Sequence, residues 1–448
     1  MTGRKARADR LCVLTVALAL ALAQYPAHWL QRQPNLPSGA SYAFFEFAPA
    51  SGAGMPAACS TTAPTGAKGE AMTFARGSVA TCTKTASGGL ATTGIANGDL
   101  VQMSSNVARV EYDSAGVLGL LVESSRTNSA LRSEELDNAV WLQNADSAAR
   151  NSTVTANQAV APDGNTTADR LDLVATTGAQ FSSRQQSAAC PATAQGMSVY
   201  LKSVTTGDSL DLCDNATCIT CTHVPGSWTR CVGSVAIVAA GAFTIGNMTV
   251  STGTPRNAQS VYVWGLQCEA GSYATSYIPT TSAAVTRSEE AADFAVSLSP
   301  TAGMCVASSM NYPSLSVLGT GGSTMSAMAT TGAAGAALGA TYLWPYSSAV
   351  NGAAAVDTAG VVSAGSSFYQ PGVIATLQGR YLVRHQGGVG NWTVCTNGSC
   401  STQGTTSTWG TPAFTRLKVD RATAAAGNAT AHIISRIQVD PVSTRCSP

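Results

Sequence analysis

The sequence predicts an all-β protein with two jelly-roll-like β-sandwich domains, which follow a signal peptide and a linker. Only 11% of its 448 residues are charged, and Gly alone contributes 43. Such a composition is poor in helix-stabilising residues and rich in turn and strand formers. Short segments of alternating hydrophobicity are separated by Gly and Asn about every ten residues, a spacing that favours a sandwich over βαβ units. The length exceeds that at which one core stops growing, so more than one domain is expected.

Residues 1–23 are predicted to be a signal peptide. Arg4, Lys5, Arg7 and Arg10 precede an apolar run at residues 11–23, which ends in the small-x-small pattern Ala-Leu-Ala. This run of 13 residues is too short to cross a bilayer. We therefore expect cleavage before Gln24, no stable membrane span, and a secreted or cell-surface protein.

The rest of the chain divides into three parts by texture. Residues 24–70 lack sustained periodicity and are rich in Ala, Pro, Ser and Gly, so they are predicted to be a linker or entry segment. Residues 71–293 contain clear alternating segments at 197–202 and 260–266 and are predicted to form the first sandwich. Residues 294–448, a second β-rich stretch, are predicted to form the second.

The charge balance argues against nucleic acid as a partner. Without residues 1–23, which hold four basic residues and one acidic residue, the chain keeps 21 basic and 23 acidic residues, a net charge of −2. No basic stripe is left to neutralise phosphates.

The cysteines agree with export. Of 13 cysteines, Cys12 lies in the signal peptide, and an even set of 12 stays in the mature chain. In an oxidising compartment such a set predicts disulfides. The motif Cys218-Ile219-Thr220-Cys221, with His223 beside it, also has the spacing of a zinc or redox site, but export favours disulfides, and no metal or other cofactor is predicted.

One disulfide can be predicted from local sequence. Asn397-Gly398 is a strong signal for a two-residue hairpin loop, because both residues tolerate positive φ. This loop makes Thr396 and Ser399 a hydrogen-bonded pair and places Cys395 opposite Cys400 at the next rung, where the separation suits an S–S bond.

The stretch from 74 to 293 resembles a β-sandwich module of phage virion proteins of the head-spike and tail-fibre-like type. The resemblance depends on ordered blocks: FARGSVAT at 74–81, NVARVEYDSAGVLGLLVESSRTN at 106–128, SEELDNAVW at 133–141, APDGNTTAD at 161–169, SVYLKS at 198–203, SWTRC at 227–231 and the closing block at 263–293. It implies a carbohydrate-binding-module-like sandwich, followed by a concanavalin A-like or laminin-G-like domain at 294–448. Family members in virions normally lack a signal peptide, so export favours a cell-surface or secreted relative.

Catalytic motifs are largely absent. The chain has no G-x-S-x-G, G-x-x-x-x-G-K or H-E-x-x-H sequence and only four histidines. Glycoside hydrolysis needs two carboxyl groups, yet from residue 294 onward the acidic residues are only Asp357, Asp420 and Asp440. The first module holds Glu111, Glu123, Glu134, Glu135 and Glu269. We interpret these as structural, with Glu123 pairing with Arg126.

The tryptophans are the candidates for stacking on sugar rings. Trp264 sits in an alternating segment and is predicted to be core. Trp344 and Tyr346 flank Pro345, which limits regular strand pairing, so they are predicted to mark a ligand site. The site residues predicted with them are Asn351, Asp357, Tyr369 and Trp392.

The sequence thus predicts a non-catalytic, lectin-like adhesion protein that recognises a surface glycan or related polymer. Two alternatives stay open. One is a secreted polysaccharide depolymerase with carboxylates in the first module or at the domain junction, and the other is a structural fibre or coat component of phage origin. The identity of the ligand and the existence of a homo-oligomer are also left open.

Overall fold

A computed structural model describes residues 43–46, 58–64, 72–84, 94–112, 118–123, 125–192, 194–215, 217–236, 241–271 and 274–298, and ten further strands between 304 and 440. The side chains that the structure describes lie within residues 58–292. The predicted signal peptide at 1–23 lies outside the described residues. Among those residues, no helix has the length and apolar character needed to cross a membrane.

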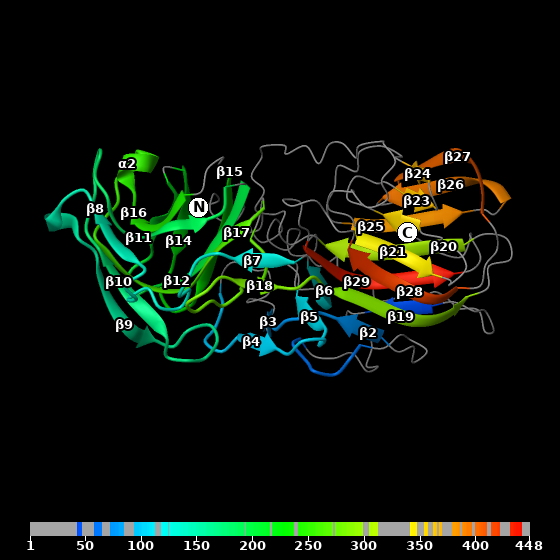
Figure 1. Ribbon diagram of the computed structural model, residues 1–448, viewed down its shortest axis with the longest axis horizontal. Helices are drawn as coiled ribbons and strands as arrows, with labels where there is room; N and C mark the ends of the chain where they lie inside the picture. Colours follow the sequence, from blue (N-terminus) through cyan, green and yellow to red (C-terminus); the bar gives the residue numbers. More distant parts are fainter. Residues whose placement is uncertain are drawn as a thin grey trace, which may run out of the picture. The chain divides into compact units, whose positions relative to one another are not determined.

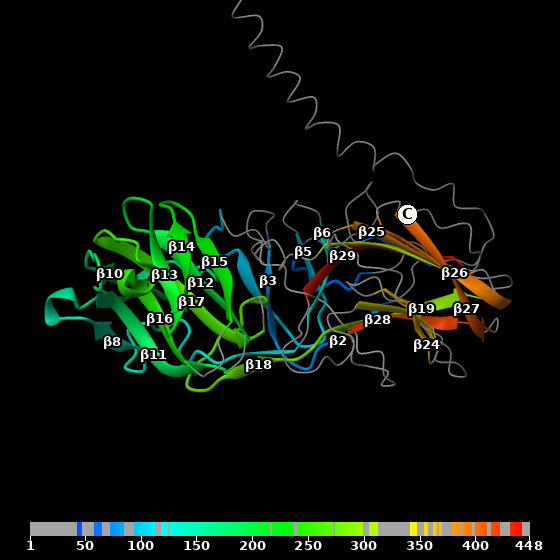
Figure 2. The same ribbon diagram turned by 90° about the horizontal axis from the view of Figure 1, so that it is seen from above.

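Two five-stranded antiparallel sheets form a sandwich, drawn in cyan to green in Figures 1 and 2. The first, called here the β17 sheet, has the order β15 (Thr229–Ala236), β12 (Ala194–Ser203), β17 (Gln259–Ala270), β10 (Ala168–Leu173) and β9 (Thr153–Ala159). The second, the β16 sheet, has the order β14 (Thr217–His223), β13 (Asp208–Asp214), β16 (Gly241–Asn247), β11 (Ser182–Cys190) and β8 (Leu142–Ala145). The two helical turns here, η1 (Ala148–Arg150) and α2 (Thr249–Thr252), are short.

The chain path through these sheets is that of a jelly roll. From β10 to β17 the strands form the neighbour orders β10-β17-β12-β15 and β11-β16-β13-β14, with β9 and β8 added at the edges. Two interlocked Greek keys give this pattern. The predicted all-β, jelly-roll-like sandwich is therefore confirmed for this part of the chain.

The core of the sandwich follows from strand alternation. Met197, Val199 and Leu201 of β12 point inward, and so do Val261 and Val263 of β17. These side chains pack against Leu210, Leu212 and Phe243 of the opposite sheet. All of these side chains are buried. The predicted alternating segments 197–202 and 260–266 are thus strands of one sheet.

A bulge in β17 changes which side chains face outward. Ser198 pairs with Gln267 but Tyr200 pairs with Trp264, so β17 has one extra residue there. Gly265 occupies it with φ +67°, and a Cβ at this position would lie 2.9 Å from the Tyr200 ring. Glycine therefore allows the aromatic rings to approach the strand.

A second apolar cluster covers the outer face of the β17 sheet. It joins Tyr200, Trp228, Trp264 and Tyr277 to Ile95 and other residues of the segment that carries β3 (Ala80–Thr83) and β4 (Leu100–Met103). Trp264 is 2% exposed, so its predicted burial is confirmed. Leu100, Trp264 and Tyr277 of this cluster also line a pocket on this face of the sheet.

The remaining strands form two larger antiparallel sheets. One has the order β27 (Ser399–Trp409), β26 (Gly388–Thr396), β25 (Gly379–His385), β20 (Met304–Asn311), β29 (Ala431–Asp440), β6 (Leu118–Glu123) and β5 (Arg109–Tyr112), with β1 (Ala43–Glu46) also on β29. The other has the order β2 (Met72–Ala75), β19 (Ala291–Leu298), β28 (Phe414–Arg421), β21 (Thr341–Tyr346), β22 (Ala354–Val356), β23 (Val362–Ala364) and β24 (Ser367–Tyr369). A short pair joins β7 (Arg126–Asn128) to β18 (Val285–Arg287).

Strand pairing crosses the domain limits expected from sequence. The limit at 293/294 falls within β19, which pairs with β2 on one side and β28 on the other. Strands β5 and β6 likewise join β29. Residues 43–46, in the predicted linker, also pair with β29. Pairing is a long-range property, so sequence texture alone did not indicate it.

Four disulfides lie in the described residues: Cys59–Cys82, Cys190–Cys268, Cys213–Cys218 and Cys221–Cys231. They confirm the prediction that cysteines of this chain form disulfides, for these eight residues. The motif Cys218-x-x-Cys221 does not act as a unit, because each cysteine is bonded to a different partner.

The predicted hairpin at Asn397-Gly398 connects β26 and β27. Thr396 is opposite Ser399, and Cys395 is opposite Cys400, as the two-residue loop requires. The register therefore agrees with the prediction, and the Cys395–Cys400 bond itself stays a prediction.

Candidate functional site

A pocket of 460 Å³ opens over the outer face of the β17 sheet. Its volume lies within the range of small-molecule sites. Aromatic, amide, carboxyl, hydroxyl and ammonium groups converge on it from separate segments. The lining residues are Thr81, Lys84, Leu100, Val101, Gln102, Glu134, Asp163, Asn165, Trp264, Tyr277 and Pro279. We call it the β17 pocket.

Two aromatic rings form its apolar wall. Trp264 faces outward by the alternation of β17, since Val261 and Val263 face the core, and Tyr277 packs on it with ring centroids 4.7 Å apart. Both residues are almost fully buried, at 2% and 1% exposed. Tyr200 meets both rings edge-on. Hydrogen bonds hold the polar ends, because Trp264 Nε1 donates to Thr167 Oγ1 at 3.0 Å and the Tyr277 hydroxyl to Glu134 Oε1 at 3.0 Å. These contacts hold the two rings in place in the protein without a ligand.

Glu134 is the electrostatically unusual group of the pocket. Burial raises its pKa to about 7, helped by the negative charges of Asp163 and Glu135, although the hydrogen bond from Tyr277 acts in the other direction. Near neutral pH this carboxyl therefore exchanges between a protonated donor and a charged acceptor. A titratable group of this kind within a pocket is typical of functional sites.

The rim is polar and accessible. A turn presents Asp163 and Asn165, with Asn165 Nδ2 donating to Asp163 Oδ2 at 2.7 Å. Gln102 on β4 is exposed, and Lys84 Nζ donates to Gly98 O at 3.1 Å. These groups offer both donors and acceptors to a hydroxyl-rich ligand.

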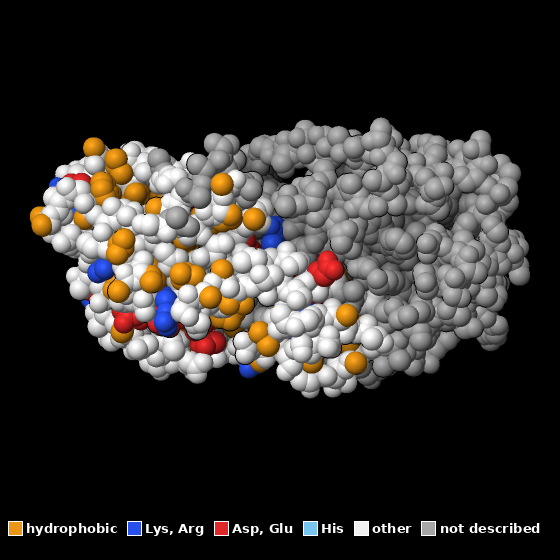
Figure 3. Space-filling view, viewed as in Figure 1, with side chains coloured by type: hydrophobic (Ala, Val, Ile, Leu, Met, Phe, Trp, Pro, Cys, Tyr) orange, Lys and Arg blue, Asp and Glu red, His pale blue; other side chains and the backbone are white. Residues whose placement is uncertain are grey.

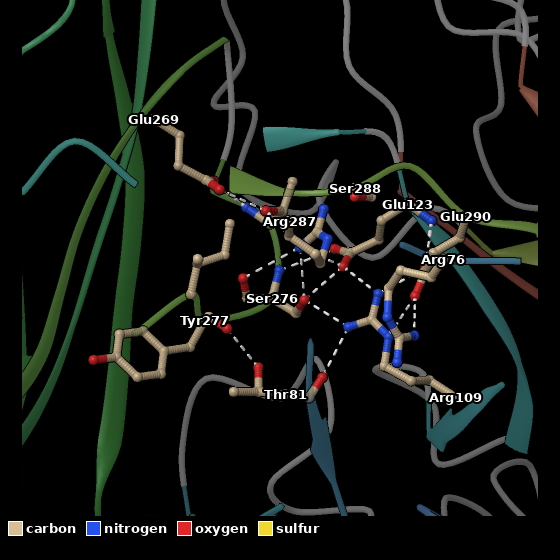
Figure 4. Close-up of polar contacts among 12 residues, drawn as sticks. Arg76, Thr81, Arg109, Glu123, Glu269, Ser276, Tyr277, Arg287, Ser288 and Glu290 are labelled. Carbon is tan, nitrogen blue, oxygen red and sulfur yellow. Dashed lines mark hydrogen bonds and ion pairs between the residues drawn. The ribbon is translucent and has the colours of Figure 1, made fainter. Parts of the chain in front are cut away.

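Most of the glutamates that were predicted to have structural roles do have them. Glu123 is fully buried and pairs with Arg109 at 2.7 Å and Arg287 at 2.9 Å, rather than with the predicted Arg126. Burial favours the neutral form of Glu123, but Arg287, Arg109 and a hydrogen bond from Ser276 outweigh it and keep its pKa below the ordinary value. Figure 4 shows this network with Glu290 and Arg76, which pair at 2.7 Å.

Two further buried glutamates, Glu111 and Glu269, differ from Glu123. Burial raises the pKa of Glu111 to about 8. Glu269 accepts hydrogen bonds from the backbone and hydroxyl of Thr275, and burial raises its pKa also. Neither lines the β17 pocket, so both are best explained as structural groups.

A buried serine–histidine contact has the local geometry of a general base. Ser203 Oγ lies 2.6 Å from His223 Nδ1, and His223 Nε2 lies 2.7 Å from Gln259 Oε1. Gln259 Oε1 can only accept, so Nε2 carries the proton and Nδ1 accepts from the serine. Ser203 and His223 are 3% and 0% exposed, and neither lines the β17 pocket. The contact therefore joins sheet to sheet in the core rather than serving a substrate.

The site predicted from sequence lies on the C-terminal strands. Trp344 and Tyr346 are on β21, Tyr369 is on β24 of the same sheet, and Trp392 is on β26 of the other sheet. The strand pairing expected to be limited at Pro345 continues through it on one side, because β21 pairs with β28 as far as Pro345 opposite Leu417 and Tyr346 opposite Arg416. Asn351 and Asp357 lie outside the described residues. This site stays a prediction.

Sequence reasoning missed the β17 pocket. Trp264 was interpreted only as core, and Glu134 only as structural. The usable signal was the glycine within an alternating strand, since Gly265 marks a bulge next to a Trp.

The described surface agrees with the weak charge of the sequence. On the face seen in Figure 3, charged side chains are few and of both signs. No group of three or more metal-binding side chains is found among the described residues.

The pKa of Glu134 gives a testable stability effect. The folded protein keeps a proton on Glu134 up to about pH 7, whereas the unfolded chain loses it near its ordinary value of 4.5. The folded state thus binds more protons in this window, and its free energy of unfolding falls as pH rises from 4.5 to 7. We expect E134Q to flatten this fall. Urea unfolding of both proteins at several pH values measures it, and equal slopes would contradict the raised pKa.

Comparison with known proteins finds similarity to solved structures alone. No protein-family model matches it, and no curated protein does. Among the similar solved structures is the N-terminal CBM22-1–CBM22-2 tandem domain of Xyn10C from Paenibacillus barcinonensis, at 8% identity. The match covers 66% of this chain and 92% of that one, with a TM-score of 0.20. A score this low supports no argument, so the jelly-roll assignment depends on the strand order.

Proposed function

We propose that the chain is an exported, non-catalytic binding protein that recognises a surface glycan or related polymer through the β17 pocket. The observation that carries the proposal is the gathering of amide, carboxyl and ammonium groups at the rim of a 460 Å³ pocket, over the nearly buried rings of Trp264 and Tyr277. The polar groups of the rim can bind the hydroxyls of a sugar. The disulfides are compatible with export.

One observation favours a second function. Glu134 and Asp163 both line the pocket, and the pKa of Glu134, raised to about 7 by burial first and by Asp163, suits a general acid. A secreted polysaccharide depolymerase is therefore the alternative. A structural fibre or coat component, as the phage-module resemblance implies, is the outcome if no glycan binds.

A glycan array combined with a reducing-sugar release assay separates these functions. We expect binding without release. Release would support the depolymerase, and the absence of both would support a structural component.

The double variant Q102A/N165A tests the position of the site. Both side chains are exposed at the pocket rim, so we expect glycan affinity to fall about tenfold while stability changes by less than about 0.5 kcal/mol. Gln158→Ala, at an exposed position of β9 outside the pocket lining, is the matched control and should bind normally. If W344A/Y346A loses binding instead, the site predicted on β21 is the correct one.

A further inference from the structure

We propose that His223 is an acid-sensitive clamp between the two sheets of the jelly roll. In its neutral form it holds one end of the sandwich closed, and in its protonated form it releases that end. The clamp is a property of the fold, so it does not depend on the binding function proposed above. It is built from a buried chain of hydrogen bonds in which each proton has a fixed place.

The imidazole of His223 connects strands from both sheets. His223 ends β14 of the β16 sheet, whereas its two partners, Ser203 on β12 and Gln259 on β17, belong to the β17 sheet. The ring nitrogens lie 2.6 Å from Ser203 Oγ and 2.7 Å from Gln259 Oε1. Because His223 is 0% exposed, this bridge is closed to water.

The hydrogen-bond chain continues beyond Gln259 and sets the orientation of its amide. Asn247 Nδ2 donates to two carbonyl groups, Val174 O at 2.8 Å and Asn257 O at 2.9 Å, so its Oδ1 is the acceptor that faces Gln259. Gln259 Nε2 donates to this oxygen at 2.8 Å and to Ser209 O at 2.9 Å. With its nitrogen held by two acceptors, Gln259 presents its carbonyl oxygen to the imidazole.

The proton positions on the ring follow from these partners. Gln259 Oε1 can only accept, so the ring proton of neutral His223 lies on Nε2, and Nδ1 accepts from the Ser203 hydroxyl. A second proton would enter on Nδ1, where the hydroxyl proton of Ser203 already points. It would also bury a charge among neutral groups, which is costly. Burial therefore lowers the pKa of His223 below its ordinary value of 6.5.

The side chains that contact the ring from β12 and β17 are neutral, and one carboxylate acts on it from β13. Among the described residues this charged group is Asp208, the partner of His223 across the β13–β14 hairpin. The hydrogen bond with Gln259 and the charge of Asp208 both favour the protonated imidazole, but burial outweighs them in setting its pKa. The carboxylate also accepts from Ser209 N at 2.7 Å and from Asn257 Nδ2 at 3.3 Å. A proton on His223 is therefore not fully compensated while the ring stays between the sheets.

Release of the clamp affects a short stretch of backbone. Ser203 N donates to Val224 O at 3.0 Å, and Ser203 also bridges to Pro225. The Cys221–Cys231 bond fixes β14 to β15 just before His223. Opening is therefore confined to the residues that follow His223 and to their contacts with β12.

Protons favour the open form below neutral pH. Once released, His223 regains its ordinary pKa of 6.5, whereas the closed form keeps a lower one. The open form thus binds more protons as pH falls through 6.5. The equilibrium constant for opening then rises by up to about tenfold per pH unit.

Amide hydrogen exchange of the full chain, followed by NMR, tests the clamp. The Ser203 amide is the reporter, and the Ser129 amide, which donates to Cys268 O at 2.9 Å, is the reference. Between pH 7.5 and 5.5 we expect the protection factor of Ser203 to fall about fivefold and that of Ser129 to stay unchanged. NMR titration of the His223 ring should give a pKa below 6.5 and a neutral form with its proton on Nε2.

Two variants report on the titration. H223Q cannot take up a proton in this range, so the protection of Ser203 should lose its dependence on pH, whatever its absolute value. D208N removes the carboxylate that favours the imidazolium, so it should lower the pKa of His223 further. H432Q, the same exchange on β29 in another sheet, is the matched control and should change neither.

Three results would overturn the clamp. One is a His223 ring that titrates at 6.5 or above, and this measurement on the wild-type chain decides even if H223Q fails to fold. Another is an equal fall of protection at Ser203 and Ser129, which shows unfolding of the whole sandwich in acid. The third is a pH dependence at Ser203 that survives in H223Q. Each leaves glycan binding at the β17 pocket, which the array tests separately, untouched.

Discussion

Replacing Arg109 with Met should lower the free energy of unfolding by about 3 to 5 kcal/mol, because it removes one partner of a buried ion network. Arg109 is fully buried and donates to Glu123 and Glu290, each at 2.7 Å. It also donates to the Thr81 carbonyl at 2.8 Å and to Ser276 Oγ at 2.6 Å. Methionine fills much of the volume but leaves two carboxylates with one cation fewer in a region that excludes water.

The matched control is R150M, which makes the same exchange at an accessible pair. Arg150 Nη1 lies 2.8 Å from Asp146 Oδ2, but the two side chains keep 24% and 23% of their exposure. An i,i+4 pair of this kind is worth about 0.3 to 0.5 kcal/mol. Urea unfolding of both variants, followed by tryptophan fluorescence, measures the difference. Similar small losses in both would show that Arg109 is not the centre of the network.

The network joins strands that are distant in sequence. Arg76 follows β2, Arg109 is on β5, Glu123 is on β6, and Arg287 and Glu290 come after β17. Its ion pairs therefore connect the segment before the jelly roll to the segment after it. Residues of this network lie in the sequence blocks at 74–81, 106–128 and 263–293, so these blocks include groups that hold the structure together.

Sequence patterns were sufficient to predict the parts of the structure that depend on neighbouring residues in the chain. Alternation identified β12 and β17, and Asn397-Gly398 fixed the register that places Cys395 opposite Cys400. Each of these signals lies within a dozen residues. The same reasoning placed Trp264 correctly in the interior.

Sequence patterns did not predict contacts between residues that lie far apart in the chain. Adjacency suggested Arg126 for Glu123, but the chain brings Arg109 and Arg287 to it instead. The β17 pocket is assembled from segments near residues 81, 102, 134, 163 and 277, and no short pattern links them. Its aromatic wall further depends on a one-residue bulge, which periodicity treats as an irregularity.

Removing the Cys190–Cys268 disulfide should lower the free energy of unfolding by about 4.5 kcal/mol, because it closes a long loop. Cys190 lies on β11 and Cys268 on β17, so the bond connects the two sheets of the sandwich across 78 residues. Without it, the unfolded chain gains the conformational freedom of that loop. We expect C190A/C268A to fold but to unfold at a clearly lower urea concentration.

The Cys213–Cys218 bond provides the control within the same protein. It joins opposite residues of one hairpin, β13 and β14, and spans only 5 residues. The same loop-closure argument gives about 2 kcal/mol for C213A/C218A. Comparing the two double variants under identical conditions tests the dependence on loop length. If the short-loop variant loses as much stability as the long-loop one, local packing around the cysteines, and not the connection between sheets, determines what these disulfides contribute.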